Sequence, residues 1–268
     1  MNHVYRIVFN HSLGVYQCVS ELAKSRGKSS GKSQVASKLL LTPLAVAMLC
    51  ASGSALADVT YDDGATTALP SSFAVDEVVT VSNGSKVTGS EMVFGFADAA
   101  ALNINTAGSV VSNDLISLAV RPDSVSVVTI DGAGSSLNAE FLTISEEGQA
   151  ELTAQNGANI TINDLTVLGL EVGSVANMTL TDKNTVFNGK SILVGDEGEG
   201  TLTIKNGAAG KFQSEVGAGI ASDSKGQITI TGAGSSLSTD RIIVGDTGEG
   251  TLVVNDSAKL TATSDIGV

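Results

Sequence analysis

The chain has 268 residues, with 15 Lys and Arg against 28 Asp and Glu and a formal charge of −13. This acidic balance argues against nucleic acid and against anionic membrane surfaces as partners, because both recruit Lys and Arg. Aromatic residues make up only 4% of the chain, which would suit disorder or a repetitive β structure, and the alternation of apolar and polar residues decides for β.

Residues 1–57 differ from the rest of the chain and are predicted to be an extended signal peptide. A long basic segment precedes the apolar run Leu39–Cys50, which is followed by Ala55-Leu56-Ala57. The run of about twelve residues is too short to span a bilayer and has the size of a signal-peptide apolar region. We therefore expect export through the Sec translocon and cleavage by signal peptidase between Ala57 and Asp58. An uncleaved anchor or a lipoprotein at Cys50 are the alternatives.

Residues 58–268 differ from the whole chain in charge and in amino-acid composition. The leader holds six of the Lys and Arg and one of the acids, so the remainder carries a formal charge of −18. It also contains no Cys, His or Trp, so its stability must come from packing and backbone pairing without disulfides.

The first part of that remainder, residues 58–77, reads DVTYDDGATTALPSSFAVDE and includes Pro70. A stack of repeats needs a distinct cap, because an open end exposes unpaired strand edges and core. We predict that residues 58–77 are an N-terminal cap or transition. No C-terminal cap is visible in the sequence.

Residues 78–268 repeat every fifty positions. SILVGDEGEGTLTIKNGA at 191–208 returns as RIIVGDTGEGTLVVNDSA at 241–258. Two apolar positions recur without a gap: Phe94, Ile144, Val194 and Val244, then Leu102, Leu152, Leu202 and Leu252. The chain is therefore predicted to be a repeat protein.

A second motif divides each fifty-residue period into two. VTIDGAGSSLN at 128–138 matches ITITGAGSSLS at 228–238, and Ile204 lies almost midway between Leu180 and Ile230. One coil of about 25 residues cannot enclose a core, but stacked coils with parallel strands can. We predict an all-β fold, a right-handed parallel β-helix (β-solenoid), since parallel crossovers are right-handed. A β-propeller is the rival fold.

Acidic residues cluster shortly before Leu152, Leu202 and Leu252. They are Glu146, Glu147, Asp196, Glu197, Glu199, Asp246 and Glu249. In a solenoid they would form one column, which we interpret as a solvated turn that protects the edge. Weak Ca²⁺ binding by Asp196, Glu197, Glu199, Asp246 and Glu249 is the functional alternative, because Ca²⁺ prefers oxygen ligands. No cofactor is predicted.

Catalytic residues are not predicted. Serine or cysteine hydrolysis needs a general base, usually His, and residues 58–268 contain none. Ser135-Ser136 and Ser235-Ser236 lie in the repeated GAGSSL turn, so turn geometry explains their recurrence.

Two stretches resemble a known family. The leader, with Tyr5-Arg6, Asn10, Tyr16 and Val19-Ser20-Glu21-Leu22-Ala23, is similar to the extended signal peptide of type V secretion proteins of Gram-negative bacteria. The VGDxGEGTL segments resemble autotransporter passenger repeats. The resemblance implies a β-helix passenger displayed on the cell surface or released, and used in adhesion or aggregation. It also implies an outer-membrane β-barrel translocator, which this chain does not include.

The leading functional hypothesis is an exported adhesin or structural stalk. The protein would pass through the periplasm and then stay at the cell surface or outer membrane, or be secreted. Its partner would be a host or bacterial surface ligand. A carbohydrate-active β-helix enzyme and a non-functional remnant of a truncated autotransporter gene are the alternatives. The sequence gives no ligand, because solenoid faces bind through shape and scattered contacts.

Overall fold

The computed structural model describes residues 5–10, 15–20 and 58–267. The chain divides into two units, residues 1–42 and 43–268. In the first, β1 (Tyr5–Asn10) and β2 (Val15–Ser20) form an antiparallel pair. The predicted apolar run Leu39–Cys50 and Ala57 at the predicted cleavage point lie outside the described residues. No helix of the described ranges is long and apolar enough to cross a bilayer.

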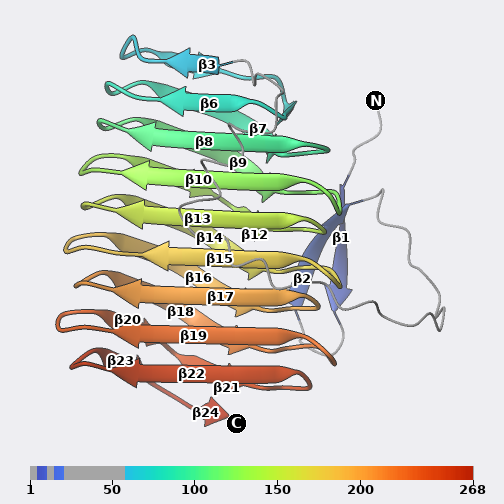
Figure 1. The fold of residues 1–268 in the computed structure, drawn as a ribbon, viewed down its shortest axis with the longest axis vertical. Helices are drawn as coiled ribbons and strands as arrows, with labels where there is room; N and C mark the ends of the chain where they lie inside the picture. The colour runs from blue at the N-terminus through green and yellow to red at the C-terminus, as the bar shows by residue number, and fades with distance from the viewer. Residues whose placement is uncertain (1–4, 11–14, 21–57, 268) are drawn as a thin grey trace. The chain divides into compact units, whose positions relative to one another are not determined.

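The second unit is built on a nine-stranded parallel sheet in which spatial neighbours are one coil apart in sequence (Figure 1). Its strands are β3 (Asp58–Tyr61), β6 (Val78–Val81), β8 (Ala99–Asn105), β10 (Val125–Asp131), β13 (Gln149–Gln155), β15 (Val175–Leu180), β17 (Glu199–Lys205), β19 (Lys225–Thr231) and β22 (Glu249–Asn255).

A thirteen-stranded parallel sheet forms the remaining sides of the coils. Its main path contains β4 (Thr66–Ala68), β7 (Lys86–Phe94), β9 (Ser109–Leu118), β11 (Ser136–Ala139), β14 (Asn159–Leu168), β16 (Val186–Val194), β18 (Ala209–Ala218), β20 (Ser236–Thr239) and β23 (Lys259–Ala262). Beside that path lie β5 (Ser72–Val75), β12 (Phe141–Ile144), β21 (Arg241–Val244) and β24 (Ile266–Gly267). The architecture confirms the predicted parallel β-solenoid; its handedness stays a prediction.

The register confirms that each fifty-residue period contains two coils, and it shows that a slightly shorter coil alternates with a slightly longer one. Leu180 pairs with Ile204, and Ile204 pairs with Ile230. The difference arises mainly in the loop that leads back into the nine-stranded sheet. Residues 145–148 make a short loop between β12 and β13, whereas residues 119–124 make a longer one between β9 and β10.

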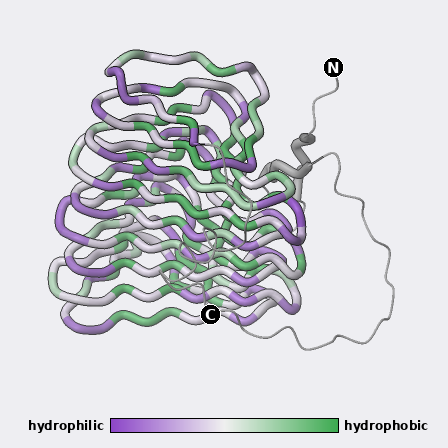
Figure 2. The backbone as a smooth tube through the Cα atoms, turned by 45° about the horizontal axis from the view of Figure 1, so that its top comes forward, coloured by the Kyte–Doolittle hydropathy of each residue, from purple (hydrophilic) through white to green (hydrophobic). Residues whose placement is uncertain are grey.

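The inward side chains form continuous columns that run along the stack. Leu102, Leu152 and Leu202 are fully buried, and Leu252 in the last coil is partly buried against the same core. In Figure 2 the hydrophobic segments recur one above another in successive coils. This column is the one predicted from the fifty-residue spacing. It forms because alternate residues of a strand point to the same side.

Residues 58–77 form a shorter coil, with Asp58 paired to Val78. Its strands β4 and β5 both pair with β7. The predicted cap is thus built from strands that continue the parallel ladder. Its role as a cap stays a prediction.

Candidate functional site

The first corner of the solenoid carries five of the seven predicted acids, whereas Glu199 and Glu249 begin β17 and β22. We call it the acidic corner: residues 95–98, 119–124, 145–148, 169–174, 195–198, 219–224 and 245–248. Each of these loops is bonded to the one before it. Glu171 N donates to Glu146 O at 2.9 Å, and Glu197 N donates to Leu170 O at 3.2 Å. The structure therefore brings the acids of neighbouring coils into one row.

The row has an electrostatic consequence at Glu171, which lies between Glu147 and Glu197. Partial burial raises the pKa of Glu171, and the negative charges of Glu197 and Glu147 raise it further. Burial disfavours a carboxylate, and like charges disfavour it too. The acidic corner thus holds its negative charge at a cost in stability.

The five Ca²⁺ candidates are not gathered around one point. Asp196 is buried, while Glu197, Glu199, Asp246 and Glu249 are exposed. Glu199 Oε1 accepts a hydrogen bond from Lys225 Nζ at 2.8 Å. Within residues 58–267, no three acidic, His or Cys side chains lie together in a way that could hold a metal ion. Ca²⁺ binding stays a prediction.

The opposite corner, which follows the nine-stranded sheet, is held by a buried hydroxyl in every second coil. Those hydroxyls belong to Ser85, Ser135, Thr185 and Ser235. Each accepts a hydrogen bond from a backbone N–H of the preceding coil, for example from Gly207 N to Ser235 Oγ at 2.9 Å. These bonds between coils give the first serine of the repeated GAGSSL motif a structural role.

Glycine is required at the acidic corner where two coils approach closely. A Cβ on Gly198 would lie 2.2 Å from Ser174 Oγ and 2.7 Å from Glu171 O. Gly148 and Gly248 occupy the same position two coils away on either side, and Cβ atoms there would also meet the preceding coil. The repeated glycine is therefore explained by packing between coils.

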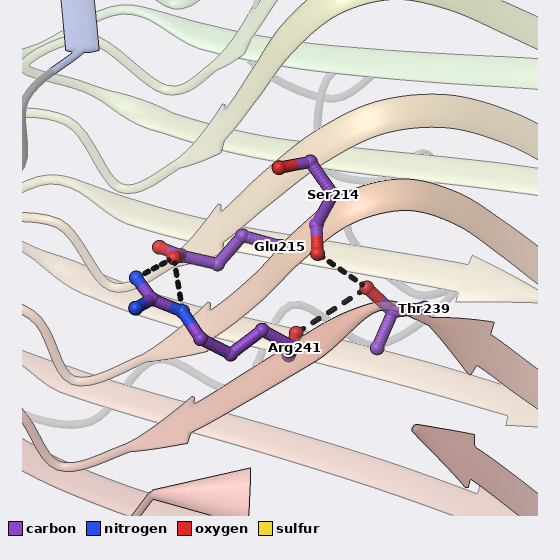
Figure 3. A network of polar contacts seen from close by, with 4 residues as sticks. All are labelled: Ser214, Glu215, Thr239 and Arg241. Atoms are coloured by element: carbon purple, nitrogen blue, oxygen red, sulfur yellow. Dashed lines mark hydrogen bonds and ion pairs between the residues drawn. The ribbon is translucent and has the colours of Figure 1, made fainter. Parts of the chain in front are cut away.

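The thirteen-stranded sheet bends between its two sides, and polar side chains link neighbouring coils at the bend (Figure 3). Arg241 Nε donates to Glu215 Oε2 at 3.0 Å, and Thr239 Oγ1 donates to Ser214 O at 3.2 Å. The ion pair between Lys190 and Asp164 likewise joins one coil to the next. Sequence reasoning missed these pairs; the available signal was that the two partners lie one coil apart along the chain.

Arg121 lies over the ring of Phe96, with 4.4 Å from Cζ to the ring centroid. Phe96 and Arg121 lie on successive loops of the acidic corner. Arg121 and Arg241 thus both contact residues of a neighbouring coil.

Two comparisons relate parts of the chain to known proteins. Residues 1–50 match the family model described as the extended signal peptide of the type V secretion system. The chain is also 37% identical over 86 residues to the autotransporter adhesin EhaG of Escherichia coli O157:H7. That alignment covers 32% of this chain and 5% of the relative. No solved structure matches the chain.

The leader, the similarity and the fold lead to one assignment. Residues 1–50 match an extended signal peptide, which directs export, and an 86-residue part of the chain is similar to an autotransporter adhesin. The chain therefore combines an export leader of the type V secretion kind with a parallel β-solenoid.

Proposed function

We propose that the protein acts as an adhesin or structural stalk in cell adhesion and autoaggregation, and that it is not an enzyme. The observation that carries this proposal is the uninterrupted nine-stranded ladder, whose corners bond to the coil before them. A stack of this kind holds its outer faces in a fixed, repeating arrangement, which suits binding over an extended surface.

The outward face of the nine-stranded sheet is the surface we assign to adhesion. One column of that face carries threonine in five successive coils, at Thr129, Thr153, Thr179, Thr203 and Thr229. All five are half-buried, and neighbouring strands lie about 4.8 Å apart. The face therefore offers a regular row of hydroxyl groups to a host or bacterial surface ligand.

Export would use the Sec translocon and signal peptidase, and passage to the surface would use an outer-membrane translocator. The match of residues 1–50 to a type V secretion leader supports both partners. The absence of His and Cys from residues 58–268 supports a non-enzymatic role, since the usual nucleophile and base pairs cannot be assembled.

The test is the sedimentation of cells that produce the protein, compared with a deletion strain and with a strain that produces T153K/T203K. We expect the wild-type cells to aggregate and adhere, and the deletion strain to lose both properties. An adhesive threonine face predicts that T153K/T203K also loses them, because two lysines interrupt the row.

A matched control places two lysines on the other sheet, at Thr161 and Asn188, in the column where Lys211 already stands. T161K/N188K should leave adhesion intact. If T153K/T203K aggregates as well as the control, the protein is a stalk without an adhesive face. If the deletion strain behaves like the wild type, the proposed function fails altogether.

A further inference from the structure

Glu151 is a half-buried carboxylate on the outward face of the nine-stranded sheet. It lies in β13, and the register places Val127 of β10 on one side of it and Asn177 of β15 on the other. Within the described residues, its Oε2 is buried and receives no hydrogen bond. Buried polar atoms are nearly always hydrogen-bonded, because an unmade bond costs free energy. This carboxylate therefore lacks a donor that a ligand could supply.

The surroundings of Glu151 contain no compensating positive charge. Strands β10, β13 and β15 include no Lys or Arg. Their other acid is Asp131 at the end of β10, and its Oδ1 accepts a hydrogen bond from Asn156 Nδ2 at 2.7 Å. Partial burial raises the pKa of Glu151, whereas a nearby cation would lower it. The missing donor is thus expected to be a cation.

The neighbours of Glu151 suit a planar cation better than a compact one. Val127 points outward beside it and is only 7% exposed, so the sheet is apolar and closed at this point. Asn177 and Thr153 are half-buried next to the carboxylate and present an amide and a hydroxyl group. A guanidinium is planar and weakly hydrated and has several N–H donors, whereas an ammonium is compact and strongly hydrated. Arginine therefore fits this surface better than lysine.

The position of the carboxylate and the charge of the chain favour contact with a basic protein. Because Oε2 is enclosed and Glu151 as a whole is half-buried, a partner would reach Oε1. Residues 58–268 carry a formal charge of −18. Such a surface attracts positively charged proteins and speeds their encounter with it.

We propose that Glu151 is the recognition site for an arginine side chain of a partner protein. Oε1 accepts hydrogen bonds from the guanidinium, whose plane lies over Val127. The inference rests on the proposed adhesive role of this face and names the chemistry of its ligand. Glu151 adjoins the threonine row at Thr153, so the row would contact the partner while the carboxylate selects the arginine.

The first test titrates the purified, isotope-labelled protein with the capped tripeptide acetyl-Gly-Arg-Gly-amide. We expect the amide signals of Val127, Glu151 and Asn177 to shift in NMR spectra. The same tripeptide with lysine should bind more weakly, and the one with citrulline, which is uncharged, should leave the signals unchanged. Equal binding of the arginine and lysine peptides would overturn the assignment to arginine.

The variant Glu151→Gln keeps the shape of the side chain and removes its charge. It should weaken binding of the arginine peptide at least about tenfold, because a hydrogen bond to a charged group is lost. Urea unfolding should show that this variant is no less stable than the native protein, because burial disfavours the carboxylate. The matched control Asp123→Asn removes one charge from an exposed acid of the acidic corner and should bind as the native protein does. Equal binding by Glu151→Gln and the native protein would overturn the proposal.

Sedimentation of cells that produce these variants separates this inference from the proposed function. Loss of aggregation in E151Q cells but not in D123N cells would support both. If native cells behaved like the deletion strain while the purified protein bound the arginine peptide, the proposed function would fail and the site would stand. If E151Q cells aggregated as native cells do, and neither protein bound the peptide, the site would fail and the adhesive role would stand.

Discussion

Two segments of nearly the same sequence, residues 191–208 and 241–258, occupy different positions in the stack. The first has a coil on both sides, and the second is followed by little described chain. Leu202 is fully buried and Leu252 only partly; Ile204 is fully buried and Val254 is 40% exposed. The comparison teaches that the neighbouring coil, and not the coil's own sequence, completes the burial of each apolar side chain.

The largest expected effect tests this difference in burial directly. Leu202→Ala should destabilise the protein by about 3 kcal/mol, because it leaves a cavity between two coils. Leu252→Ala should cost about 1 kcal/mol, because less apolar surface is removed from contact. Urea unfolding of both variants measures the difference. Equal losses would show that the last coil is as enclosed as the middle of the stack.

Substitutions at Gly195 and Gly245 test how strongly a corner packs against the coil that follows it. A Cβ on Gly195 would lie 2.2 Å from Lys225 O of the following coil, whereas the nearest atom to a Cβ on Gly245 lies 3.3 Å away. Both glycines have positive φ. Gly195→Ala should therefore cost about 2 kcal/mol or more, and Gly245→Ala about 1 kcal/mol, the strain of the backbone conformation.

The matched control is the pair Gly198→Ala and Gly248→Ala. Both Cβ atoms would meet the preceding coil, at 2.2 and 2.4 Å, so these two variants should lose similar stability when all four glycine variants are compared by thermal melting. A large difference in stability between these two variants would mean that residues 241–267 also pack loosely against the preceding coil.

The buried hydroxyls allow the bonding between coils to be tested without changing the apolar core. Ser235→Ala leaves the N–H of Gly207 without its partner and should cost about 1–3 kcal/mol. Ser235→Thr should cost much less, because Thr185 already makes the same bond to Gly157 N at 2.9 Å. Chemical denaturation compares the two. Similar losses would assign the effect to packing and not to the hydrogen bond.

The smallest expected effect concerns the acidic corner of the middle coils. The pKa of Glu171 in the folded protein is raised above 4.5, so the folded state binds protons more tightly and loses stability as pH rises through this range. Glu171→Gln should then be more stable than the native protein at pH 7, by less than about 1 kcal/mol because the group is half exposed. The difference should disappear below pH 4.5, in melts recorded across the range.

The periodic sequence was sufficient to predict the fold, because each inward position repeats in phase with its neighbours. The inward positions of Leu152 and Leu202, and the division of each period into two coils, could be read directly. The contacts of charged side chains could not be predicted from the sequence. Arg241 reaches Glu215 only because the bend places their strands side by side, and the preceding period has Ser191 where Arg241 stands.

Backbone conformation at the corners was also only partly predictable. Glycine accounts for the positive φ of Gly195, but Ala119 and Ser145 adopt the same conformation at equivalent corners. Ser145 Oγ donates to Gly148 O at 2.5 Å, which helps to hold that turn. Stacking therefore imposes a conformation that the residue type alone would not favour.

The alternation of long and short loops limits how such a gene can change in length. Removing one coil would set two loops of the same kind against each other, whereas removing two adjacent coils preserves the order of the loops. Duplication or loss should therefore occur in steps of fifty codons, and the number of repeats could vary between strains while every junction remained compatible with its neighbours.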